Sequence, residues 1–348
     1  MSENITHAHK IFSLLDEEYR LKKWTGQDPL LSRQMRLSQD ILAVFAVRKT
    51  DGKHILYFQC NPEDAVKGHK YPAWKGITID FSGFENPGME GCYVRIEQGE
   101  SSDNDVYFAV SEDLCLCLKD VERANLRFKL STALERWKRF FSLRESIVLT
   151  REEQIGLFGE LYLLRSMMKN GIVASNAISC WKGPYQGVYD FSLSNMSIEV
   201  KTTASKMPYK VHISNEMQLD DRLAGGILVL SFIAVQPSDS SGETLGDVVK
   251  DIVYFIEEDE ASRSLFQDKI FGCGLGNSYI DRYISKYIIK EHGFYNVQEN
   301  FPRILSKDLA KGLGDISYSL DISACSNYLM DEQQFWQIAK LYIKEDII

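Results

Sequence analysis

Three charged residues, Asp190, Glu199 and Lys201, are spaced so that they can meet on one face of a β-hairpin. Residues 188–193 and 197–203 have the composition of two short strands joined by a polar turn. Successive side chains of a strand point to opposite faces, so Glu199 and Lys201 share one face. With a two-residue turn, Asp190 lies directly opposite Glu199, with the Cβ atoms about 4.5–5.5 Å apart. The sequence therefore predicts two facing carboxylates with a lysine beside them.

Two carboxylates that face each other on a sheet repel, and a single lysine relieves only part of that repulsion. A divalent cation between them would relieve it, because Mg²⁺ takes oxygen ligands, typically one or two carboxylates, and keeps waters or phosphate oxygens at its other positions. A lysine beside such a metal can orient or deprotonate an attacking water, since its pKa shifts readily. The alternative is a half-exposed hairpin with a Glu–Lys pair on its solvent face.

A helix that precedes the hairpin contributes a third acidic residue, Glu160. Residues 150–153 have the Thr-x-x-Glu sequence of a capping box, which predicts that the helix begins at Thr150. Its apolar stripe consists of Leu157, Leu161, Leu164 and Met168. A carboxylate on this stripe is costly to bury unless it is paired or bound to metal, and Gly156 and Gly159 would let a backbone or ligand approach closely. Alternatively, Glu160 lies at the edge of the stripe and reaches water.

Glu160 on a helix, Asp190 on one strand and Glu199-Val200-Lys201 on the next together resemble the PD-(D/E)XK nuclease superfamily. The sequence is similar in particular to the PD-(D/E)XK motif proteins of bacterial restriction-like systems. Further segments that carry the resemblance are residues 159–161, 181–184, 198–203, 212–214, 218–219 and 301–304. One position departs from the pattern, since Tyr189 stands where the superfamily name has a proline.

The resemblance implies hydrolysis of DNA phosphodiester bonds with Mg²⁺, for which Mn²⁺ can substitute. Asp190 and Glu199 would hold the metal together with the backbone carbonyl of Val200. Lys201 would position the attacking water and stabilise the transition state. Glu160 would bind a second metal or orient water in the outer coordination shell. Gln218 could touch the scissile phosphate or a water, although an isolated glutamine is also common on surfaces.

The composition of the 348-residue chain is that of a globular protein, with 44% hydrophobic and 26% charged residues. No run of about 18 apolar residues is present, so no membrane span is predicted. The first residues lack the basic and apolar regions of a signal peptide, and seven cysteines without paired spacing indicate reduced thiols. We therefore expect a cytoplasmic protein with structural cysteines.

The net charge of −9 argues against indiscriminate coating of DNA, because affinity that comes mainly from phosphate contacts needs a basic face. The clearest basic segment spans residues 127–144 and fits an amphipathic helix. Its basic side is either a solvated face or a phosphate-binding surface. Lys206 and Lys210 add positive charge near the predicted site.

Two domains are expected, and the fold class is α/β (α+β overall). Residues 1–124 would form a β-rich recognition or interaction domain, and residues 125–348 a restriction-endonuclease-like core with a mixed sheet and C-terminal helical and strand additions. The first domain has a leading helix over residues 11–21. Its strands are predicted at residues 41–48, 54–59, 76–81, 92–97 and 106–110. A bridging helix over 126–141 would end at a joint near 142–146, and in the second domain residues 215–223 are expected as a helix and 227–235 as a buried strand.

The function that these expectations favour is a metal-dependent DNA endonuclease of a bacterial restriction or phage-defence system. Its partners would be DNA and either a second copy of the chain or ATPase, methyltransferase or nuclease subunits. Two alternatives remain open at this point. One is a catalytically silent DNA- or protein-binding subunit of a defence complex that retains the nuclease fold. The other is a hydrolase or transferase of a different kind whose charges imitate the motif.

Overall fold

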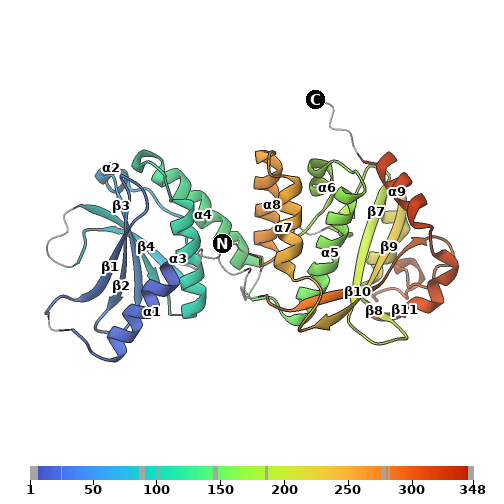
Figure 1. Cartoon of the computed structure of the whole chain (residues 1–348), viewed down its shortest axis with the longest axis horizontal. Helices are drawn as coiled ribbons and strands as arrows, with labels where there is room; N and C mark the ends of the chain where they lie inside the picture. Colours follow the sequence, from blue (N-terminus) through green and yellow to red (C-terminus); the bar gives the residue numbers. More distant parts are fainter. Residues whose placement is uncertain are drawn as a thin grey trace. The chain divides into compact units, whose positions relative to one another are not determined.

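The computed structural model describes residues 7–24, 26–85, 91–100, 102–143, 148–184, 187–275, 280 and 283–343 of the chain. Contacts between residues divide the chain into two compact units, called unit 1 and unit 2 below, with the division between residues 147 and 148. Each unit has its own sheet and its own helices (Figure 1).

The helix that was expected to bridge to the second domain belongs to unit 1. This helix, α4 (Arg123–Leu143), packs against α3 (Asn104–Cys117) and β3 (His54–Cys60) of that unit. Leu126, Leu130 and Trp137 on its inner side are fully buried. The expected boundary after residue 124 would remove this apolar side from its partners, so the compact unit extends past it. Of the expected joint at 142–146, residues 144–146 lie outside the described residues.

Unit 1 is an antiparallel sheet with helices on one face (Figure 1). Its strands are β1 (Leu30–Arg36), β2 (Leu42–Arg48), β3, β4 (Ile77–Ser82) and β5 (Cys92–Gln98), in the spatial order β1-β2-β3-β5-β4. Its helices are α1 (His7–Arg20), the short α2 (Pro62–Val66), α3 and α4. Both faces of β2 and β3 are almost entirely buried. Helices α1 and α4 cover one face, and the other face carries an apolar cluster that includes Val44 and Tyr57.

The strand expected at residues 106–110 is wrong, because this segment lies inside α3. The carboxylate of Asp103 accepts a hydrogen bond from Asp105 N at 2.7 Å and caps the helix. Residues from Tyr107 to Cys115 are all buried. A short apolar run that is buried on every side has no helical or strand period, which explains the misassignment. The strand β1 was not predicted.

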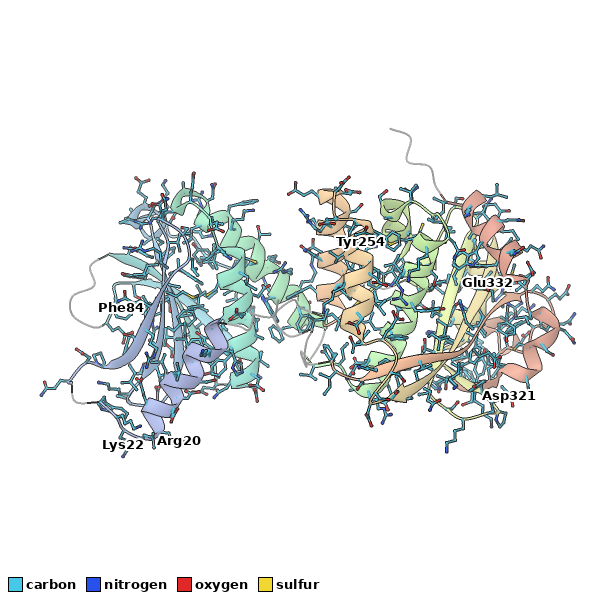
Figure 2. All side chains as sticks on the ribbon, viewed as in Figure 1. Arg20, Lys22, Phe84, Tyr254, Asp321 and Glu332 are labelled. Atoms are coloured by element: carbon cyan, nitrogen blue, oxygen red, sulfur yellow. The ribbon has the colours of Figure 1, made fainter. Side chains whose placement is uncertain are left out.

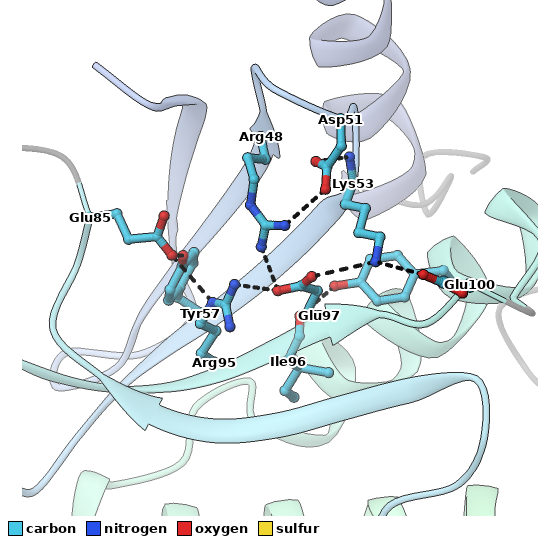
Figure 3. A network of polar contacts seen from close by, with 10 residues as sticks. Arg48, Asp51, Lys53, Tyr57, Glu85, Arg95, Ile96, Glu97 and Glu100 are labelled. Carbon is cyan, nitrogen blue, oxygen red and sulfur yellow. Dashed lines mark hydrogen bonds and ion pairs between the residues drawn. The ribbon is translucent and has the colours of Figure 1, made fainter. Parts of the chain in front are cut away.

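A network of charged side chains lies on the sheet of unit 1 (Figure 3). At its centre, Glu97 accepts a hydrogen bond from Arg48 at 2.6 Å and forms a second ion pair with Arg95. Lys53 Nζ is 4.0 Å from the same carboxylate. Arg95 also pairs with Glu85 at 3.4 Å. The carboxylate of Glu97 is therefore surrounded by cations of the protein itself.

Unit 2 is built around a mixed four-stranded sheet. In spatial order its strands are β10 (Lys286–Val297), β9 (Ile227–Ser238), β7 (Met196–Thr203) and β6 (Phe191–Ser192). Strand β7 runs parallel to β9, whereas β10 and β6 are antiparallel to their neighbours. A separate two-stranded sheet pairs β8 (Lys210–Ile213) with β11 (Tyr318–Asp321). The helices are α5 (Arg151–Lys169), α6 (Ala174–Cys180), α7 (Leu245–Phe255), α8 (Glu260–Gly272) and α9 (Glu332–Leu341).

Helix α5 packs on β7, and α7 packs on α5 (Figure 1). The opposite face of the sheet carries an apolar core that includes Leu230, Phe232 and, from β8, Val211 and Ile213. Side chains fill the space between helices and sheet in each unit (Figure 2). The mixed sheet with helices confirms the predicted fold class, and the buried strand predicted at 227–235 is β9.

The helix expected at residues 215–223 is instead two short 3₁₀ turns, Glu216–Leu219 and Asp221–Leu223. Asn215 and Asp220 each accept a hydrogen bond from the backbone N–H two residues later, so each side chain starts a new turn and interrupts the helix. Among the helices of the described residues, none is both long and apolar enough to cross a lipid bilayer.

Candidate active site

The hairpin of β6 and β7 has the register that the sequence predicts. Phe191 pairs with Ile198 and Ser192 with Ser197. Leu193 N donates a hydrogen bond to Met196 O at 2.8 Å, which closes a two-residue turn. Extending this register by one residue places Asp190 opposite Glu199.

Strand β6 is much shorter than β7, and Asp190 occupies the point where the two strands separate. The Oδ2 atom of Asp190 accepts a hydrogen bond from Val200 N at 2.7 Å. The side chain thereby accepts the hydrogen bond of the Val200 N–H group, which a backbone carbonyl would accept if β6 were longer. The backbone of Asp190 is held from the other side, because Lys182 N donates to Asp190 O at 2.8 Å.

Lys201 lies between Glu199 and Gln218. Its Nζ atom is 2.8 Å from Glu199 Oε1 and donates a hydrogen bond to Gln218 Oε1 at 2.9 Å. The same Gln218 oxygen accepts a hydrogen bond from Ser214 N at 2.9 Å. Gln218 thus fixes the lysine to the turn after β8, and its amide nitrogen remains the group that can donate to a substrate.

Glu160 reaches the same region from helix α5. The helix approaches β7 closely at Gly159, where an added Cβ would lie 1.8 Å from Thr202 Oγ1. Only glycine allows this approach, as expected for Gly159. By contrast, an added Cβ at Gly156 would meet nothing within 4 Å, so the close approach expected there does not occur.

The carboxylate of Glu160 is hydrogen-bonded to an indole. Trp181, which is fully buried at the end of α6, donates from Nε1 to Glu160 Oε2 at 2.8 Å. In the sequence this tryptophan is visible only as part of the family resemblance. The spacing of the two residues along the chain does not indicate their contact, because the rest of α5, a turn and helix α6 connect them.

Burial raises the pKa of all three carboxyl groups of the site. The pKa of Glu199 rises to about 8 because of burial and the nearby charge of Asp190, and the ion pair with Lys201 opposes the rise. Burial, followed by the charge of Asp190, raises the pKa of Glu160 well above its usual value, although the Trp181 hydrogen bond lowers it. The pKa of Asp190 is also raised by burial, and the Val200 N–H and Lys201 lower it. The protein therefore supplies too little positive charge to stabilise these carboxylates in their ionised form.

The shortage of positive charge around these carboxyl groups raises the question of whether the site fits a metal ion. Carboxylate oxygens on β6 and β7 are the ligand type that Mg²⁺ and Mn²⁺ prefer. Within the described ranges, no group of three or more histidine, cysteine, aspartate or glutamate side chains is arranged to hold a metal. The chain fits an ion that takes one or two carboxylates and fills its other positions with water or phosphate, as Mg²⁺ does.

The basic segment predicted as a phosphate-binding or solvated helix face is part of α4 in unit 1, and Arg144 lies outside the described residues. Arg127 pairs with Asp64 at 3.4 Å, and Arg136 pairs with Asp113 at 2.7 Å. The charges of these two arginines are therefore partly used within unit 1. In unit 2, Lys206 and Lys210 are exposed next to β7 and at the start of β8.

Comparison with known proteins gives one match. The model of the family described as "Putative PD-(D/E)XK family member, (DUF4420)" matches residues 11–323. The matched range includes all of the candidate site residues named above. Neither a curated protein nor a solved structure matches the chain.

Proposed function

The chain belongs to this PD-(D/E)XK family, and on that premise we propose that it is a metal-dependent DNA endonuclease that hydrolyses phosphodiester bonds. We further propose that it acts in a bacterial restriction or phage-defence system. Members of the superfamily have a nuclease-like fold and typically use divalent metals.

The observation that carries the proposal is the convergence of three carboxyl groups, the buried Glu199 and the partly buried Glu160 and Asp190, near Lys201 at the end of a split hairpin. Burial raises the pKa of each of these carboxyl groups. Glu97 of unit 1 shows that this protein surrounds a buried carboxylate with cations where the role is structural. A deficit of positive charge supports binding of a cation from solution.

In the proposed site, Asp190 and Glu199 would hold Mg²⁺, with the Val200 carbonyl as a further ligand. When bound, the metal supplies a water of lowered pKa and neutralises charge that develops on the phosphate. Glu160 would hold a second ion or orient water in the outer shell.

The remaining roles belong to Lys201 and Gln218. The Nζ atom of Lys201 carries a positive charge between Glu199 and Gln218, where it would orient the attacking water and stabilise the negative charge of the transition state. Because the Gln218 oxygen already accepts from Lys201 and Ser214, its amide N–H groups would donate to a phosphate oxygen.

DNA is the proposed substrate. The described part of one chain contains one such site, whereas cleavage of both strands requires two. We therefore propose a homodimer, or assembly with ATPase, methyltransferase or nuclease subunits.

The test combines Mn²⁺ binding by isothermal calorimetry with plasmid cleavage in Mg²⁺ or Mn²⁺. We expect the unchanged protein to bind metal and to nick the plasmid, Asp190→Ala to lose both activities, and Lys201→Ala to lose cleavage only. Metal binding without cleavage on any plasmid would favour the catalytically silent subunit. Absence of metal binding would contradict the nuclease.

A further inference from the structure

A lysine of helix α8 is buried at the end of helix α6. Only 5% of the Lys269 surface is exposed. Its Nζ atom donates hydrogen bonds to Ile178 O at 2.7 Å and to Trp181 O, and it lies 6.0 Å from the centre of the Trp181 ring. Burial lowers the pKa of this ammonium group to about 8. A buried cation at unpaired carbonyl groups of a helix C-terminus stabilises that end of the helix.

The segment that Lys269 holds touches two acidic residues of the candidate site. The Trp181 indole donates to Glu160 Oε2 at 2.8 Å. The next residue, Lys182, donates its backbone N–H to Asp190 O at 2.8 Å. Trp181 also forms a β-bridge with Phe191, the residue after Asp190. The position of this two-residue segment therefore determines where both acidic residues lie.

The packing around the segment leaves it little freedom. An added Cβ at Gly183, whose φ is +56°, would lie 3.3 Å from the Trp181 ring. An added Cβ at Gly272, at the end of α8, would lie 2.5 Å from Pro184 Cγ. Phe266 of α8 lies against the Trp181 ring, with the ring centres 6.2 Å apart. Helix α8 thus contacts the segment through Lys269 and Phe266, and its end at Gly272 lies against Pro184, two residues beyond the segment.

We propose that Lys269 is a positioning residue that holds the Trp181–Lys182 segment and, through it, orients Glu160 and Asp190 for metal binding. This inference rests on the proposed function, because it concerns the same site. The contacts support this role. The ammonium group connects α8 to the backbone of Trp181, and the segment makes one hydrogen bond to each acidic residue. No other role for a buried ammonium group is needed to explain its contacts.

The first experiment measures Mn²⁺ affinity of the full chain by calorimetry for Lys269→Met, which keeps an unbranched side chain one atom shorter and removes its donors. Supports around metal ligands are worth roughly 10–100-fold in metal affinity, so we expect weakening in that range. Trp181→Phe keeps an aromatic ring at this position but removes the indole donor, and should weaken Mn²⁺ binding as well. Lys250→Met is the matched control, because Lys250 is an exposed lysine of α7. Its affinity should not change.

A purely structural role would lower the unfolding temperature of Lys269→Met but leave the Mn²⁺ affinity of the folded protein unchanged, and that result would overturn the proposal. If Lys269→Met does not fold, the Mn²⁺ affinity of Lys269→Arg is measured instead. We expect Lys269→Arg, which retains donors and charge, to bind Mn²⁺ more tightly than Trp181→Phe, and the opposite order would contradict the proposal.

A metal-free measurement separates this inference from the proposed function. The difference between the near-UV circular dichroism of the unchanged protein and that of Trp181→Phe isolates the Trp181 indole. The same difference is then taken with and without Trp181→Phe in protein that carries Lys269→Met or Glu160→Gln. Each of these changes should alter the difference spectrum, because each removes a contact that orients the indole. If the unchanged protein binds no Mn²⁺ but the spectrum changes as expected, the nuclease proposal and the link to metal binding fail, and only the role of Lys269 in holding the Trp181–Lys182 segment against Glu160 stands. A spectrum unaffected by Lys269→Met would overturn the positioning role.

Discussion

Glu97 in unit 1 and Glu199 in unit 2 are both buried carboxylates on sheet strands, yet their surroundings differ. Glu97 contacts the cations Arg48, Arg95 and Lys53, as Figure 3 shows. Glu199 has one such contact in the described part of the chain, with Lys201, and its neighbourhood includes the charges of Asp190 and Glu160. The first carboxylate is neutralised by the protein, whereas the second is left short of positive charge.

The difference follows from the energy of burying charge. A carboxylate that leaves water must gain nearly equivalent interactions from its new surroundings, or it takes up a proton instead. Arginine guanidinium groups supply these interactions to Glu97 permanently. At Glu199 the missing interactions leave a place for an exchangeable cation. We infer that the balance of charge around a buried acid distinguishes a structural acid from one that serves a metal.

The largest expected effect comes from removing a carboxylate of the charge-deficient cluster. Asp190→Ala should lower the rate of DNA cleavage by at least about 10²–10³-fold, the loss typical when one group that stabilises the transition state is removed. Plasmid cleavage measures the rate, and circular dichroism checks that the fold is retained. Asp51→Ala, which removes a carboxylate paired with Arg48 in unit 1, is the control and should cleave normally. Equal activity of both variants would contradict the assignment.

The next effect concerns stability and should differ between the two clusters. Glu97→Gln removes the carboxylate that Arg48 and Arg95 share, and should lower the free energy of unfolding of unit 1 by about 1–3 kcal/mol. Glu199→Gln in metal-free protein replaces a carboxyl group whose ionised form is repelled by Asp190, and should not destabilise unit 2. Chemical denaturation followed by circular dichroism measures both changes. Destabilisation by Glu199→Gln as large as that by Glu97→Gln would show that the two clusters do not differ.

The dependence on pH tests the same contrast without a mutation. Since the folded pKa of Glu199 is about 8, above the usual glutamate value of 4.5, the folded state holds its proton more tightly than the unfolded state does. The stability from this group is fully present below pH 4.5 and is lost as pH rises through 8. Metal binding needs the ionised form, so Mn²⁺ affinity should rise over the same window, by at most about tenfold per pH unit for one released proton.

Two measurements check this dependence. Calorimetry between pH 6 and pH 9 follows the Mn²⁺ affinity, and denaturation of the metal-free protein follows the stability. Glu199→Gln should flatten the fall in stability with pH, because its amide does not titrate. A Mn²⁺ affinity that is independent of pH would be inconsistent with a raised pKa at Glu199.

The smallest expected effect is at Gln218, which touches the cluster only through Lys201. Gln218→Ala removes the acceptor for Lys201 and Ser214. We expect cleavage to fall roughly 10-fold, the lower end of the range for a residue that supports the first shell. Met217→Ala, a change at the exposed neighbour, is the control. A loss at Gln218 as large as that at Asp190 would contradict the supporting role of Gln218 relative to the carboxylates.

The sequence by itself determined the hairpin and its charged residues. The two-residue turn, the alternation along β7 and the register that places Asp190 opposite Glu199 are local properties, and the structure has all of them. The capping box at Thr150 likewise begins α5 at the predicted place. Short-range patterns of this kind are set by backbone geometry within a few residues, so they can be read without knowing the rest of the fold.

Only the tertiary structure decided which distant residues support the site. Trp181 and Lys269 meet near Glu160 because α6 and α8 pack against each other, and nothing in their spacing along the chain indicates it. Residues 106–110 became helix rather than strand, and α4 joined unit 1, because packing partners outweighed local preference. The balance of charge around Glu97 and Glu199 was decided in the same way. It depends on which strands and helices pack together, because the interaction energy between charges is larger when they are buried.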